Sequence, residues 1–226
     1  MKNIITSLII LFVTAGSINA QMSAFTNGAI HSVPGAHGPG DGKEVVGSRN
    51  LLDDYYKGMV VNQHDSIIEA DVVFNYDKMT GSLLMKNDKQ EYYTVDDQNI
   101  RSFTLKAPGK DYIFEKVPAV NDHDFLEVLA KGNNFSVYKL VRVSYKKSNY
   151  HTDGLTETGN KYDEYVDESK YFLLNNNSNS ARQFELKKHS ITEIFGQDKA
   201  APYFATHKND KIDEQFLAGL AASVNQ

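Results

Sequence analysis

The sequence predicts a mainly β protein: a curved antiparallel β-sheet or meander, sandwich-like or roll-like, with two C-terminal α-helices. Three observations lead to this fold class. Between Gly58 and Leu186, short runs of alternating apolar and polar residues follow one another, which is typical of strands with one buried face. Turn-forming pairs such as Thr80-Gly81 separate these runs, and such short connections favour antiparallel pairing. Near its end the chain changes to the period of a helix.

The alternation is clearest around Phe74. Val72, Phe74 and Tyr76 point to one face of an extended chain, while Asp71 and Asn75 point to the other. The same reasoning gives the expected strands, which are, in chain order, Gly58–Asn62, Ser66–Tyr76, Ser82–Lys86, Glu91–Val95, Ile100–Leu105, Asp111–Lys116, Phe125–Ala130, Phe135–Tyr145, Glu168–Leu174 and Arg182–Leu186.

The eighth of these strands has one exception in its pattern, and a polar region follows it. Lys139 lies on the same face as four apolar residues, Phe135, Val137, Val141 and Val143. The segment from Lys147 to Asp167 is polar, and we expect a hairpin there.

Two helices are expected after the strands. Ser190 followed by Glu193 is the spacing of a capping box, which predicts a short helix through about Phe195, ended by Gly196. Residues 209–224 predict a second helix whose single apolar stripe packs against the sheet; the stripe consists of Ile212, Phe216, Leu217, Leu220 and Val224.

The first twenty residues have the layout of a cleaved secretory signal. Lys2 supplies a short positive region, an apolar stretch covers residues 4–13, and small residues end at Ala20, so the mature chain is expected to begin at Gln21. The alternative is a membrane anchor, but the apolar stretch is about half of the roughly 20 residues that a spanning helix needs. We therefore expect an exported protein, periplasmic or secreted.

Composition narrows the possible chemistry. The chain has 226 residues, a formal charge of −5, no cysteine and no tryptophan. Absence of cysteine excludes disulfides, thiol nucleophiles and Cys-type zinc sites, and the mildly acidic balance does not fit a nucleic-acid binder. Residues 21–46 lack a periodic pattern and are rich in glycine around 35–42, which predicts a flexible segment. The remaining residues, 47–226, are expected to form one β-rich domain.

Several short motifs resemble a family of uncharacterised exported proteins common in Bacteroidota. The longest is GSRNLLDDYYKGMV, from Gly47 to Val60, and the others are Phe74–Asp77, Ile100–Leu105, Phe125–Leu129 and Phe184–Lys188. The resemblance implies a β-rich envelope or secreted protein of bacterial origin, and it implies no catalytic residues. The segment 147–167 is longer than the resemblance leads us to expect.

No catalytic or metal-binding constellation is evident. The Gly-x-Ser-x-Gly turn of serine hydrolases is absent, and the seven histidines lack the His-x-x-x-His spacing of a helix-borne metal pair. Neither a metal nor a cofactor is expected. A hydrolase with a site assembled from distant strands remains an alternative, and it predicts a deep pocket that joins two or more of His123, His151, Asp122 and Asp153.

Tyrosine pairs are the strongest indication of a binding role. Tyr55-Tyr56 and Tyr92-Tyr93 each place one ring on either face of an extended segment, so that one ring of each pair is expected in the core and the other at the surface. An exposed ring can stack on a sugar or pack against a protein. The sequence therefore favours a non-enzymatic exported domain that binds a partner protein or a glycan through these residues. A purely structural envelope component is the further alternative.

Overall fold

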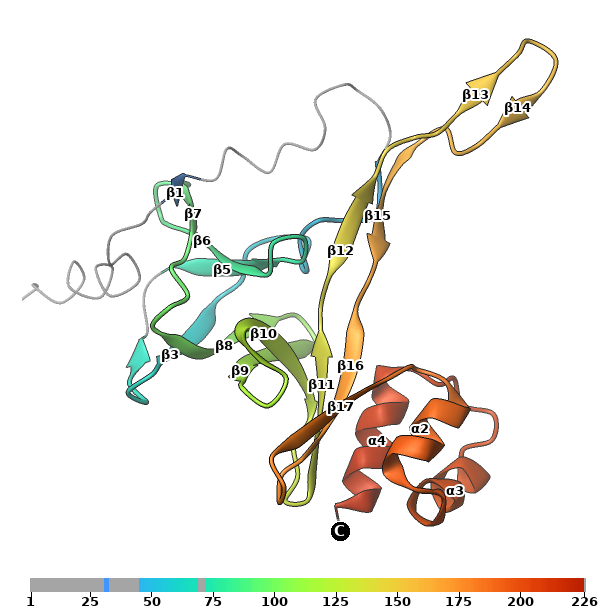
Figure 1. The fold of residues 1–226 in the computed structure, drawn as a ribbon. Helices are drawn as coiled ribbons and strands as arrows, with labels where there is room; N and C mark the ends of the chain where they lie inside the picture. Colours follow the sequence, from blue (N-terminus) through green and yellow to red (C-terminus); the bar gives the residue numbers. More distant parts are fainter. Residues whose placement is uncertain (1–30, 33–44, 69–71, 226) are drawn as a thin grey trace, which may run out of the picture.

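The computed structural model describes residues 31–32, 45–68 and 72–225. The expected export signal, 1–20, and most of the glycine-rich segment, 21–46, lie outside the described residues. The part described is mainly β, with a large antiparallel sheet and C-terminal helices, which confirms the predicted fold class (Figure 1). Among the helices of these residues, none has the length and apolar character needed to cross a membrane.

The largest sheet has eight strands, and all its neighbouring strands are antiparallel. In sheet order they are β17 (Ser180–Phe184), β16 (Lys170–Asn175), β11 (Phe135–Leu140), β10 (Asn121–Ala130), β9 (Lys110–Val117), β8 (Ile100–Ala107), β3 (Gly58–Asn62) and β4 (Ile67–Ile68). The run β8–β9–β10–β11 is the meander that the short connections predict. Strand β11 then pairs with β16 because the residues between them leave the sheet.

A second sheet shares one apolar core with the first. Its order is β1 (His31–Ser32), β7 (Tyr92–Thr94), β6 (Ser82–Lys86) and β5 (Val73–Asp77). Phe74 and Tyr76 of β5 lie in one cluster with Phe103 of β8 and Phe114 of β9. The prediction of a single strand over Ser66–Tyr76 is wrong, since β4 joins the first sheet and β5 the second. Alternation of residue types does not show which neighbour a strand pairs with.

The outer face of the second sheet is covered by the segment that precedes β3. Asn75 is buried there: its Oδ1 accepts a hydrogen bond from the Leu52 amide (3.1 Å), and its Nδ2 donates to the carbonyls of Leu52 (2.9 Å) and Asp54 (3.0 Å). Asp77, also buried, accepts a hydrogen bond from Arg49 Nε (2.8 Å). These bonds fix the segment that carries the first tyrosine pair.

Residues 143–167, called the arm here, project from the body of the molecule (Figure 1). They form β12 (Val143–Lys146), β13 (His151–Thr152), β14 (Glu157–Thr158) and β15 (Asp163–Asp167), and β15 also pairs in parallel with β2 (Val45–Val46). The hairpin expected in this region is therefore present. The prediction of one strand over Phe135–Tyr145 is wrong, because the chain breaks at Val141, which is buried in the core, and continues into the arm as β12.

Three helices follow β17, where the pattern predicted two: α2 (Lys188–Phe195), α3 (Gln197–Thr206) and α4 (Glu214–Val224). The capping box predicted at Ser190 is wrong. Helix α2 begins at Lys188, and Ser190 Oγ instead accepts a hydrogen bond from the amide of Glu185 (3.0 Å). Gly196 ends α2 as predicted, with φ of 90°. Helix α3 has Pro202 in its interior, and proline is a helix breaker by sequence rules.

The last helix packs against the sheet through the predicted stripe. Asp213 caps it by accepting a hydrogen bond from the Phe216 amide (3.0 Å). Phe216, Leu217 and Leu220 are buried in a second apolar cluster with residues of β11, β16, β17 and the other helices. Ile212 precedes the helix but still packs against this cluster.

Candidate functional site

Two of the four predicted tyrosines meet at the surface. Tyr55 lies in the segment that covers the second sheet, and Tyr92 begins β7. Their ring centroids are 5.5 Å apart at an interplanar angle of 64°, an edge-to-face contact. Lys86 is paired with Tyr92 across β6 and β7, and its Nζ lies 5.3 Å from the centroid of the Tyr55 ring. The structure thus adds a lysine to the predicted aromatic site.

Tyr55 lines a hollow of about 330 Å³, and Tyr92 lies beside this hollow through its contact with Tyr55. Tyr92 is 40% exposed, whereas Tyr55 is half-buried. The hollow is lined by Tyr55, Val72, Val73, Lys86, Asn87, Asp88 and Gln90. Burial raises the pKa of Tyr55 to about 12, so that its hydroxyl remains a hydrogen-bond donor at neutral pH. The hollow combines an aromatic edge and two valines with the polar ends of four other side chains.

The other two tyrosines have a different environment. The rings of Tyr56 and Tyr93 pack against the core shared by the two sheets. The hydroxyl of Tyr56 donates to Asp53 Oδ1 (2.8 Å), and that of Tyr93 donates to Glu91 Oε2 (2.7 Å). Each tyrosine pair therefore contributes one ring to the aromatic contact and one to the core.

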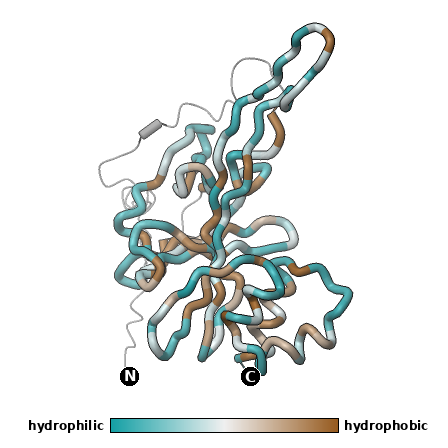
Figure 2. The backbone as a smooth tube through the Cα atoms, turned by 45° about the vertical axis from the view of Figure 1, so that its right-hand side comes forward, coloured by the Kyte–Doolittle hydropathy of each residue, from teal (hydrophilic) through white to brown (hydrophobic). Residues whose placement is uncertain are grey.

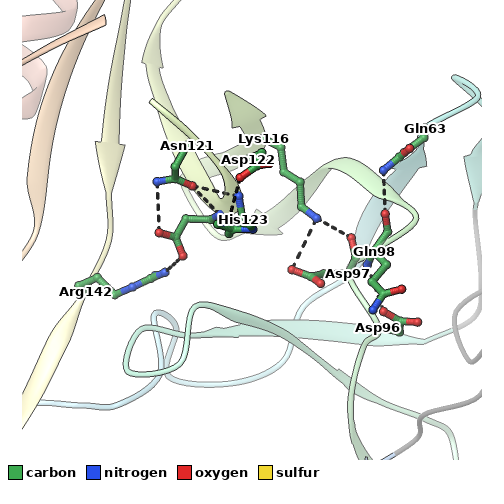
Figure 3. A network of polar contacts seen from close by, with 10 residues as sticks. Gln63, Asp96, Asp97, Gln98, Lys116, Asn121, Asp122, His123 and Arg142 are labelled. Carbon is green, nitrogen blue, oxygen red and sulfur yellow. Dashed lines mark hydrogen bonds and ion pairs between the residues drawn. The ribbon is translucent and has the colours of Figure 1, made fainter. Parts of the chain in front are cut away.

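The residues of the hydrolase alternative are spread over two regions. Asp122 and His123 lie at the start of β10, where Nε2 of His123 is 2.9 Å from Oδ1 of Asp122 and the histidine side chain is 86% exposed (Figure 3). His151 and Asp153 belong to the arm. Asp153 closes the turn at the tip of the arm by accepting hydrogen bonds from the amides of Leu155 (2.9 Å) and Thr156 (2.7 Å).

A small hollow of about 240 Å³ adjoins His123, and it includes neither His151 nor Asp153. Its carboxylates already have partners: Asp124 binds Arg142, and Asp97 lies 3.7 Å from Lys116 (Figure 3). Arg142 in turn donates to the hydroxyl of Tyr76 (2.9 Å), which ties this network to the core. Among the residues that the structure describes, no group of three or more His, Asp and Glu side chains is placed to hold a metal ion. The arrangement is that of a polar link between strands.

Comparison of the chain with family models, with curated proteins and with solved structures finds no match. The candidate site therefore rests on its geometry. Sequence reasoning found Tyr55 and Tyr92 but missed Lys86, because the contact depends on the register of β6 and β7, which pairs Lys86 with Tyr92. The only available signal was the closeness of Lys86 and Tyr92 on either side of a polar turn.

Proposed function

We propose that the protein is an exported, non-enzymatic binding domain that binds an envelope glycan at the hollow beside Tyr55 and Tyr92. The observation that carries this proposal is the edge-to-face contact of the two rings, 5.5 Å apart, with Lys86 over one of them. Sugars are bound through their apolar C–H faces and their hydroxyl groups. An aromatic surface beside amide, carboxylate and ammonium groups offers both kinds of contact.

The small size of the candidate site favours a glycan over a partner protein. A stable protein interface buries about 800 Å² on each side and has an apolar core with a polar rim. Here the exposed aromatic surface is centred on one ring. The polar side chains next to it in the hollow are Lys86, Asn87, Asp88 and Gln90. A hollow of about 330 Å³ is at the lower end of the range of small-ligand sites.

The environment of the surface also argues against a purely structural role. The segment that carries Tyr55 is fixed by hydrogen bonds to the buried Asn75, so the ring is held in place before any ligand arrives. Such preorganisation lowers the entropy cost of binding. Tyr92 nevertheless exposes 40% of its surface, although it lies in a strand whose next residue packs against the core.

The test is binding of the protein, from Gln21 onward, to an array of bacterial envelope glycans. We expect retention of one class of glycan, and we expect the Tyr92→Ala variant to lose at least tenfold in affinity. The matched control is Tyr150→Ala. Tyr150 is exposed like Tyr92, and it has Lys161 over its ring at 4.9 Å as Tyr55 has Lys86, but it lies on the arm and not beside the hollow.

The possible results are distinct. Loss of binding in Tyr92→Ala but not in Tyr150→Ala supports the proposal. Equal loss in both variants, or no glycan retained, contradicts it. A parallel pull-down from the envelope fraction tests the alternative of a protein partner. A protein that the unchanged chain retains and the Tyr92→Ala variant does not would show that the ligand is a protein and not a glycan.

A further inference from the structure

A second cavity lies between the large sheet and helix α4, and Tyr55 and Tyr92 are not part of it. Its volume is about 640 Å³, within the range of small-molecule sites. One part of its lining is aliphatic and consists of Val128, Leu129, Leu186 and Ala218. The other part is polar and consists of Gly109, Lys110, Tyr171, Asp213, Glu214 and Gln215.

Two charged residues and a tyrosine from three neighbouring strands form a row next to this cavity. Glu127 of β10 is paired with Lys139 of β11, and Lys139 with Tyr171 of β16. Glu127 is 2% exposed and accepts a hydrogen bond from Lys110 Nζ (2.7 Å). Lys139, the exception in the apolar pattern of its strand, donates to Glu214 Oε1 (2.6 Å).

The positive and negative charges of this row pair with one another, yet some of their donors and acceptors remain available to the cavity. Lys110 carries three N–H donors, of which Glu127 uses one, and its side chain is about half exposed. On the side of α4, Lys139 and Tyr171 both donate to Oε1 of Glu214, and none of the described residues donates to Oε2. The cavity therefore offers ammonium donors from one wall and a carboxylate oxygen from another.

The protonation states of Lys110 and Tyr171 agree with a cavity wall that donates hydrogen bonds. Burial alone would lower the pKa of Lys110, but the hydrogen bond and the charge of Glu127 outweigh it and raise the pKa. Burial, followed by the charge of Glu214 and the hydrogen bond to it, raises the pKa of Tyr171. Lys110 is therefore charged and Tyr171 neutral at physiological pH.

We propose that this cavity binds a short aliphatic peptide through both of its charged ends. The α-carboxylate accepts hydrogen bonds from Lys110, the α-ammonium donates to Oε2 of Glu214, and the aliphatic side chains lie against Leu129, Leu186 and Ala218. A simple anion is a poorer fit because Asp213 and Glu214 lie at the same cavity. A simple cation is a poorer fit because Lys110 lines it. A ligand that carries both charges satisfies both walls.

The test is calorimetric titration of the whole protein with the dipeptide leucyl-leucine. The first variant, Ala218→Phe, fills the cavity from α4 and keeps all of its charged residues. Its matched control is Ala222→Phe, one turn further along the same helix, where the side chain is exposed. We expect at least a tenfold loss of affinity in Ala218→Phe and no change in Ala222→Phe, with the circular dichroism spectrum of both variants unchanged.

A second measurement needs no variant and therefore does not depend on folding. The blocked peptide N-acetyl-leucyl-leucine amide has the same aliphatic groups but neither charge. We expect it to bind at least tenfold more weakly, since it cannot form the two hydrogen bonds between charged groups. Equal binding of the two peptides, no heat with leucyl-leucine up to millimolar concentration, or unchanged binding by Ala218→Phe would each overturn the proposal.

Discussion

The body of the molecule and the arm are both made of antiparallel strands, but different forces hold them. In the body, the rings of Phe103 and Phe114 stack with centroids 4.8 Å apart, and Tyr76 stacks on Phe114 at 4.6 Å. In the arm, Leu155 at the tip is 95% exposed, and Figure 2 colours most of the arm hydrophilic. An isolated two-stranded hairpin is marginally stable in water. Because β2 adds a third strand beside β15, it is the two-stranded part of the arm beyond β12 and β15 that needs other support.

Polar bonds supply that support. Asp163, at the outer end of the pairing between β12 and β15, is 5% exposed, accepts a hydrogen bond from the Ser148 amide (2.6 Å), and also accepts one from the hydroxyl of Tyr145. Further out, Asn149 Oδ1 accepts a hydrogen bond from the Asn160 amide (2.7 Å). The same secondary structure therefore depends on burial in one region and on a few side-chain acceptors in another. The two regions should then respond differently to mutation.

The largest expected effect is in the core of the body. Phe103→Ala removes a fully buried ring that contacts Phe114, Tyr76 and Phe125. We expect the free energy of unfolding to fall by about 3–5 kcal/mol, because the substitution loses apolar burial and leaves a cavity. Urea unfolding followed by circular dichroism measures this loss. A decrease of less than about 1 kcal/mol in the free energy of unfolding would mean that the two sheets do not depend on this cluster.

A smaller effect, and one that depends on pH, is expected at the ion pair that fixes the segment over the second sheet. Burial by itself would raise the pKa of Asp77, but the hydrogen bonds from Arg49 and Thr80 and the charge of Arg49 outweigh it, and the pKa is lowered. A lowered folded-state pKa contributes stability that is present above the unfolded pKa of about 3.9 and is lost as the pH falls through the folded value.

Arg49→Met should remove most of this contribution. We expect a loss of about 1–3 kcal/mol at pH 7, since the buried carboxylate loses its charged partner. We also expect the variant to be less sensitive than the unchanged protein to acidification below about pH 4, because the lowered pKa of Asp77 depends on Arg49. Thermal unfolding from pH 7 to pH 2 tests both points. Parallel pH curves for the two proteins would contradict the role given to this pair.

The same division explains how far the sequence predicts the fold. Strands with apolar faces were predicted well, and Gly58–Asn62 and Ser82–Lys86 have the bounds that the pattern gave. The arm gave only a polar hairpin, because its strands have no buried face and their pairing depends on acceptors such as Asp163. Likewise, helix α3 was missed because Pro202 lies inside it.

The candidate site was predicted in part for a related reason. Aromatic pairs in the sequence pointed to Tyr55 and Tyr92, but their contact joins two segments whose relative position is set by the buried Asn75 and by strand register. The pattern assigned Asn75 to a polar face, and nothing local indicated that a preceding segment covers that face. Contacts between distant segments follow from tertiary packing, which residue periodicity does not contain.

The smallest effect on global stability is expected in the arm, where a mutation separates the stability of the arm from that of the body. Asp163→Ala removes the acceptor of the Ser148 amide and of the Tyr145 hydroxyl. Because none of the apolar clusters formed by the described residues includes a residue of the arm, we expect the free energy of global unfolding to change by less than about 0.5 kcal/mol. Local opening should become easier by about 1–3 kcal/mol, since the Ser148 amide loses its acceptor.

Hydrogen exchange separates the two quantities. The Ser148 amide should exchange about tenfold faster or more in Asp163→Ala, while the amides of β8 in the body keep their rates. Faster exchange in β8 as well would show that the arm and the body unfold together. An unchanged rate at Ser148 would show that the strand pairing of β12 with β15 is enough to hold the arm, and that its buried carboxylate contributes little. The first result would mean that arm and body form one cooperative structure. The second would mean that backbone pairing alone stabilises the arm. Either would contradict the contrast between a body held by burial and an arm held by polar acceptors.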